Sequence, residues 1–188
     1  MGTGPLPRSS ADRLAYVTSG EAMTRKVTTI GVYGFDGDSF YRALQDAGVD
    51  VLIDIRQRRG VRGVRHAFAN SRRLQTRLAE LGIRYLYRRD LAPPPSVRQH
   101  QKLADRASKT IKRQRAELAP AFIEAFENEV LAHFEPQTLL DDLGPGEQVI
   151  ALLCVEREPA ACHRSLVAER LAQALSLEVE HILPDPER

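Results

Sequence analysis

The chain has 188 residues, of which 43% are hydrophobic, and this length and composition favour one compact domain with a single core. No apolar run reaches the roughly 20 residues that span a bilayer, and no signal pattern opens the chain, so we expect a cytoplasmic protein without a membrane segment. Two cysteines do not make a disulfide framework, so both are expected as thiols unless they form a redox pair.

The net charge of +2 conceals an uneven distribution along the sequence. Between Arg56 and Arg115, 18 basic side chains stand against three acidic ones, so this segment carries +15 and the remainder carries −13. A basic segment of this kind favours a negatively charged partner such as a nucleotide, a nucleic acid or an acidic protein. The alternative is that it pairs with the protein's own acidic helices or with another subunit of a homo-oligomer.

The first 25 residues mix Gly, Pro, Ser and Thr without periodicity and predict a flexible tail, in which Met23 is an alternative start. Residues 26–188 are expected to form a single α/β domain. Near residues 92–118 this domain is expected to carry a basic helical insertion, which begins after a rigid run of prolines.

Strand patterns alternate with helical patterns throughout the domain. Strands are expected at residues 27–33, 49–55, 83–87, 148–155 and 178–183. Helices are expected after a cap at Asp36 or Asp38, and over residues 71–81, 121–134 and 162–175. The alternation predicts an α/β fold with a mainly parallel sheet of about five strands flanked by helices.

Ligands of such folds bind beyond the carboxyl ends of the strands. Four chemically active stretches are expected to meet there: residues 34–39, 54–66, 87–89 and 154–164. In the first of them, Gly34 would let backbone N–H groups approach a ligand.

The segment 149–166 contains a strand, a short loop and a helix start. Cys162 would lie at the helix N-terminus, where the helix dipole and neighbouring cations favour a reactive thiolate; the alternative is a small packed residue that caps the helix. His163 can act as an acid or a base, and Arg164 can offer a bidentate fork to a phosphate.

Asp54 and Arg56 lie two residues apart and share one face at the end of the central strand. They predict either a structural ion pair or a site in which Asp54 acts as a base while Arg56 and Arg62 bind an anion. Glu156 is a further candidate for the reactive carboxylate.

The two cysteines would lie close in space, because the loop between them is short and turns back over the strand. Close thiols can form a reversible disulfide or, with His163 and Glu156, a metal site. Since the spacing of Cys154 and Cys162 matches no standard zinc signature, no metal site is predicted, and the sequence names no cofactor.

A cluster of arginines after the second strand has the composition of a polyanion-binding surface. The nucleic-acid contacts are assigned to Arg58, Arg59, Arg72 and Arg73. Tyr85 and Tyr87 share a face of the next strand and serve either for packing or for base stacking.

Several of these segments resemble the family known as domain of unknown function 488. The resemblance rests on residues 29–34 (TIGVYG), 51–56 (VLIDIR), 82–85 (GIRY), 152–156 (LLCVE) and 162–168 (CHRSLVA). It implies a Rossmann-like α/β fold, while the family has no established activity. Residues 91–95 (LAPPP) depart from a Leu-Gly-Gly element of many members, and Arg62 alone matches the arginine of the preceding loop.

The leading prediction is a protein that binds a phosphate-bearing ligand, either a nucleotide or a nucleic acid, at the C-terminal edge of the sheet. The sequence leaves open whether a transfer or hydrolysis reaction follows, and therefore whether the protein is an enzyme. Two alternatives are a non-catalytic nucleic-acid-binding module and a thiol redox switch that uses Cys154 and Cys162.

Overall fold

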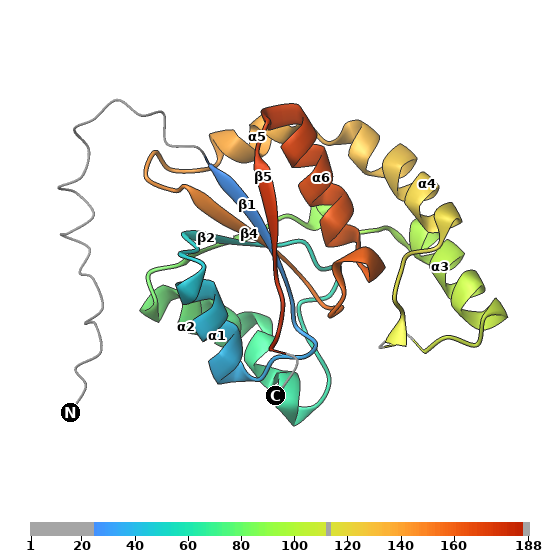
Figure 1. Ribbon diagram of the computed structural model, residues 1–188, viewed down its shortest axis with the longest axis horizontal. Helices are drawn as coiled ribbons and strands as arrows, with labels where there is room; N and C mark the ends of the chain where they lie inside the picture. The colour runs from blue at the N-terminus through green and yellow to red at the C-terminus, as the bar shows by residue number, and fades with distance from the viewer. Residues whose placement is uncertain (1–24, 112–113, 186–188) are drawn as a thin grey trace.

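Five parallel strands form one sheet at the centre of the computed structural model, which describes residues 25–111 and 114–185 (Figure 1). The strands are β1 (Lys26–Gly31), β2 (Val51–Asp54), β3 (Arg84–Tyr87), β4 (Val149–Cys154) and β5 (Glu178–Ile182). Their order is β3-β2-β4-β1-β5, and all four pairings are parallel. The predicted α/β fold is confirmed and is consistent with a Rossmann-like architecture. Apart from Arg25, the predicted tail lies outside the described residues.

Helices cover both faces of the sheet (Figure 1). One face packs against α1 (Gly37–Asp46) and α2 (Ser71–Glu80). The other face packs against α3 (Pro95–Ala107), α4 (Pro120–Glu129), α5 (Pro136–Asp141) and α6 (His163–Leu175). Short 3₁₀ turns, η2 (Val64–Ala69), η3 (Arg89–Leu91), η5 (Leu131–His133) and η6 (Pro159–Ala161), lie in the connections. None of the helices in the described part combines the length and apolar composition that a membrane crossing requires.

The strand order creates an opening between β2 and β4. The chain leaves β2 toward the β3 edge through α2, and it leaves β4 toward the β5 edge through α6 on the other face. Because two adjacent strands send their connections in opposite directions, their carboxyl ends form a crevice, the usual ligand site of open α/β sheets.

The central strands are buried on both faces, which explains their nearly continuous apolar sequences. Val51, Leu52 and Ile53 have no exposed surface, and they divide between the two apolar layers: Val51 and Ile53 face α4 and α6, whereas Leu52 faces α1 and α2. Burial of this strand therefore fixes the edge from which Asp54 and the following loop emerge.

Helix α1 begins at the predicted cap. The carboxylate of Asp36 accepts a hydrogen bond from the backbone N–H of Ser39 at 2.8 Å, and the Asp36 N–H donates to the Ser39 hydroxyl at 3.1 Å. This reciprocal pair satisfies two of the N–H groups that a helix start leaves open.

The basic segment near residues 92–118 is packed against the domain along one side. Helix α3 packs against α4 and buries Val97 and Gln101, while most of its other residues are exposed. Gln101 accepts a hydrogen bond from the backbone N–H of Ala119 at 2.9 Å, which ties α3 to the start of α4.

Candidate functional site

A cavity of about 700 Å³ opens at the carboxyl ends of β2 and β4. The loop after β2 forms one wall, α3 forms a second, and the β4–α6 junction forms the floor. Tyr33 and Phe122 add aromatic surface to the lining. The cavity therefore occupies the position that the strand order predicts for a ligand.

Positive charge dominates the cavity lining, which holds Arg56, Arg58, Arg62, Arg98, Lys102 and Arg115 against Asp105 and Glu156. Arg115 is neutralised by Asp105, with 2.6 Å between Nη2 and Oδ2. Within residues 25–111 and 114–185, Arg58, Arg62, Arg98 and Lys102 form no ion pair with a carboxylate. The Nε of Arg98 is also buried without a hydrogen-bond partner there. These four side chains give the cavity a net attraction for anions.

Asp54 and Arg56 form a buried ion pair behind the cavity wall. Nε and Nη2 of Arg56 donate to the two carboxylate oxygens of Asp54 at 2.8 and 2.7 Å, and its Nη1 donates to the carbonyl of Ala69 at 2.9 Å. Tyr85 donates to the same carboxylate at 2.8 Å, and burial together with the charge of Asp54 raises the pKa of Tyr85 to about 12. This geometry favours the structural interpretation of the pair over a catalytic Asp54 and an anion-binding Arg56, although Arg56 borders the cavity.

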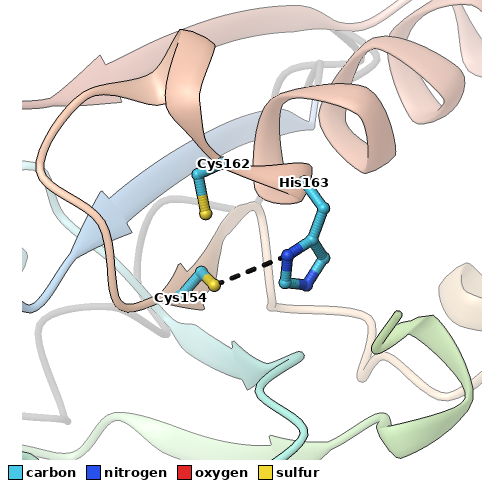
Figure 2. A group of neighbouring side chains, drawn as sticks. All are labelled: Cys154, Cys162 and His163. Atoms are coloured by element: carbon cyan, nitrogen blue, oxygen red, sulfur yellow. Dashed lines mark hydrogen bonds between the residues drawn. The ribbon is translucent and has the colours of Figure 1, made fainter. Parts of the chain in front are cut away.

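The cavity floor brings together two thiols and an imidazole, which point toward one another in Figure 2. Cys154 ends β4, Cys162 is the N-cap of α6, and His163 is the first residue of that helix. Cys154 Sγ lies 3.7 Å from Nδ1 of His163. Nε2 of His163 lies 3.2 Å from the carbonyl oxygen of Ile55, so Nε2 carries the hydrogen and Nδ1 faces the sulfurs. Glu156 Oε2 lies 3.7 and 3.6 Å from the sulfurs of Cys154 and Cys162.

The two thiols differ in acidity. Burial opposes ionisation of Cys162, but hydrogen bonds with Cys154 and His163 and the charge of Arg164 hold the pKa of the Cys162 thiol well below its ordinary value. The hydrogen bond with Cys162, burial and the Glu156 carboxylate raise the pKa of the Cys154 thiol. Burial favours a neutral His163, yet its hydrogen bond with Cys162 raises the pKa of the imidazole. Cys162 is therefore the more acidic thiol, as its place at a helix N-terminus predicts.

Arg164 stabilises the loop between β4 and α6 through hydrogen bonds to its backbone. Its side chain has no exposed surface and is not among the residues that line the cavity. It donates to the carbonyl oxygens of Glu156 and Arg157 at 2.5 and 2.8 Å. A Cβ added to Gly31 would lie 2.0 Å from the same Glu156 oxygen, so only glycine fits beneath this loop. The structure thus assigns Arg164 to loop positioning, whereas the sequence predicted ligand contact.

Of the other predicted ligand and nucleic-acid residues, Arg58 and Arg62 reach the cavity lining. Gly34 adopts a φ of +96° and packs near Pro184 instead. Arg59 lies over the ring of Tyr87, with 4.3 Å from its guanidinium carbon to the ring centroid. The remaining pair, Arg72 and Arg73, is exposed on α2, on the opposite face of the sheet from α3.

Two of the four stretches that were expected to meet at the sheet edge form the cavity, residues 54–66 and 154–164. Residues 34–39 and 87–89 do not line it.

Helix α3 supplies a wall that was not assigned to the site from sequence. Arg98, Gln101, Lys102 and Asp105 all line the cavity, at the spacing of one helix face. The signal for this wall was present in the sequence, because Arg98 and Lys102 lie four residues apart next to the apolar anchor Val97. The sequence does not show whether this face of α3 points toward the cavity or away from it.

The family model for the domain of unknown function DUF488 matches residues 36–171, which is most of the chain. The chain belongs to this family. The DUF488 match spans α1 through most of α6 and includes the strands β2 and β4, whose ends carry the cavity. No curated protein and no solved structure matches the chain.

Proposed function

We propose that this chain binds a phosphate-bearing small molecule of nucleotide size in the cavity between β2 and β4. The observation that carries this proposal is a set of four cations around one concave site, none of which pairs with a carboxylate of the described residues: Arg58, Arg62, Arg98 and Lys102. Guanidinium groups match the geometry of phosphate oxygens, and a volume of about 700 Å³ falls within the range of small-molecule sites.

A small ligand suits this site better than a nucleic-acid strand does. These four cations converge on a cavity, whereas Arg72 and Arg73 are exposed on the other face of the sheet. Tyr33 and Phe122 offer aromatic surface for a base within the same cavity. A nucleotide would thus find its phosphate contacts and a stacking surface in one place.

The chemistry proposed for this site is transfer or hydrolysis of a group on the bound ligand. Glu156 is buried, lines the cavity and lies beside the cysteine and histidine side chains of the floor. A carboxylate held in this way can accept a proton from an attacking group. The hydrogen bond that Arg164 donates to the carbonyl oxygen of Glu156 keeps the backbone of Glu156 in position.

Thermal unfolding with matched ligand pairs tests the proposed binding. At about 100 times its dissociation constant, a ligand adds about 2.7 kcal/mol to the stability, so ADP at that concentration should raise the melting temperature by roughly 5–10 °C. Adenosine at the same concentration and ionic strength should produce a much smaller shift. Equal shifts with ADP and adenosine, or no shift with pyrophosphate, AMP, ADP or ATP, would contradict the proposal. A shift with single-stranded oligonucleotides alone would favour a nucleic-acid-binding module.

The two buried thiols support a second candidate function, a reversible disulfide switch. The sulfurs of Cys154 and Cys162 lie within 4.8 Å of each other, and a disulfide requires closure to about 2.05 Å. Glutathione disulfide would accept the two electrons and two protons that the thiols lose, and it would leave as two glutathione thiols. Peptide mapping after this oxidation should find a Cys154–Cys162 crosslink in the native chain and none in Cys154→Ser. Two free thiols in the treated native chain would exclude the switch.

A further inference from the structure

The cavity floor contains the ligand set of a metal site. Cys154, Cys162 and His163 each offer one ligand atom, and all three atoms lie within 4.8 Å of one another. Thiolate and imidazole together suit zinc, a borderline-soft ion that binds sulfur and nitrogen. Two thiolates would also neutralise the charge of a divalent ion, which removes most of the cost of burying it.

The separation of Cys154 Sγ and His163 Nδ1 fits tetrahedral coordination. With bonds of about 2.3 Å to sulfur and about 2.05 Å to nitrogen, tetrahedral angles place sulfur and nitrogen ligands roughly 3.6 Å apart. The observed separation between Cys154 Sγ and His163 Nδ1 is 3.7 Å. A zinc ion could therefore bind this pair with little movement of either side chain.

The outer contacts of His163 are those that a metal-bound histidine requires. Its Nε2 donates to the carbonyl of Ile55 at 3.2 Å, which leaves the lone pair of Nδ1 directed toward the sulfurs. Metal-binding histidines almost always donate their second ring N–H in this way, because the hydrogen bond fixes both tautomer and ring orientation. The β4–α6 loop is fixed as well, by Arg164 and by the close approach of Gly31.

The three ligands lie on the lining of the cavity and not within a closed core. Structural zinc sites use four protein ligands, whereas catalytic sites use three and keep the fourth position for water or substrate. Here the carboxylate of Glu156 lies on the same lining, 3.7 and 3.6 Å from the two sulfurs. Three protein ligands on a cavity lining match the pattern of a catalytic site more closely than that of a closed structural one.

We propose that Cys154, Cys162 and His163 bind one Zn²⁺ ion whose fourth coordination position faces the cavity. The proposal goes beyond anion binding by Arg98 and Lys102, and it does not depend on it. The seven residues between the cysteines match no standard zinc signature, and this spacing led the sequence to predict no metal. The cysteines lie close together despite this spacing, because η6 turns the chain back and brings Cys162 to the end of β4.

Metal analysis of the full chain tests the proposal. The protein purified under reducing conditions with Zn²⁺ and then desalted should retain about one zinc per chain. After removal of zinc with a chelator, titration with Co²⁺ should give a thiolate-to-cobalt charge-transfer band and the intense visible bands of tetrahedral cobalt. Cys154→Ser, Cys162→Ser and His163→Gln should each lower the zinc content to near zero or change the cobalt spectrum.

Matched controls separate metal binding from folding. His133→Gln removes an exposed histidine outside the site and should keep the native zinc content and cobalt spectrum. Circular dichroism of each variant checks that it is folded, and the cobalt spectrum of the native chain reports thiolate ligation without any substitution. A native chain that binds no zinc, or a cobalt complex without a charge-transfer band, would overturn the proposal. Nucleotide affinity enters none of these readouts, so this result is independent of the test of the phosphate site.

Discussion

Replacing Arg56 with alanine should lower the free energy of unfolding by about 3–5 kcal/mol. The substitution leaves the carboxylate of Asp54 fully buried without its ion-pair partner, since Arg56 donates to both carboxylate oxygens, at 2.8 and 2.7 Å. It also removes the hydrogen bond to Ala69 that ties the end of β2 to the far end of the following loop. Tyr85 alone cannot replace a guanidinium as the counter-charge. Equilibrium denaturation with urea measures the loss.

Arg58→Ala provides the matched control for this stability measurement. Arg58 lies two residues further along the same loop but is exposed, so its removal should change stability by no more than about 0.5 kcal/mol. Combining Arg56→Ala with Asp54→Asn should cost less than the sum of the two single changes, because the second change removes the stranded charge. A small effect of Arg56→Ala, similar to that of Arg58→Ala, would show that the ion pair does not hold the fold together.

The fold could be predicted from the sequence because hydrophobic periodicity carries most of the information needed. The apolar run at 49–55 and the alternation of strands with amphipathic helices predicted a parallel sheet, and the observed strand Val51–Asp54 lies within that run. The strand order was not predicted, because periodicity identifies an element without fixing its neighbours. Only the fold shows that β4 lies between β2 and β1 and thereby creates the crevice.

The site was predicted less completely, for a physical reason. Sequence spacing indicated that Cys154, Cys162 and His163 would lie near a helix start, and the structure places them together on the cavity floor. Spacing cannot show how deeply a charged side chain is buried. For this reason the sequence assigns Arg56 and Arg164 to a ligand. In the structure, Arg56 donates hydrogen bonds to Asp54, and Arg164 donates hydrogen bonds to loop carbonyls.

Removing the charges of Arg98 and Lys102 together should weaken ADP binding about 100-fold. A hydrogen bond to a charged group contributes about 1.5–3 kcal/mol, so the loss of two such contacts costs roughly 3 kcal/mol, and each 1.4 kcal/mol is a factor of ten. Stability should change little, since Lys102 is exposed and the buried Nε of Arg98 has no hydrogen-bond partner within the described residues to lose. The matched control is the double variant Arg72→Ala, Arg73→Ala, which makes the same change in net charge on α2.

Isothermal titration of ADP into the native chain, the Arg98→Ala, Lys102→Ala variant and the α2 control tests most directly whether this cavity binds phosphate. The cavity variant should bind ADP with an affinity about 100-fold lower than that of the native chain. The control should keep nearly native affinity, because α2 covers the other face of the sheet and physiological salt screens charges beyond about 8 Å. Equal losses in the two variants would show a general effect of net charge, and native affinity in the cavity variant would place the phosphate elsewhere; either result would contradict the proposed site.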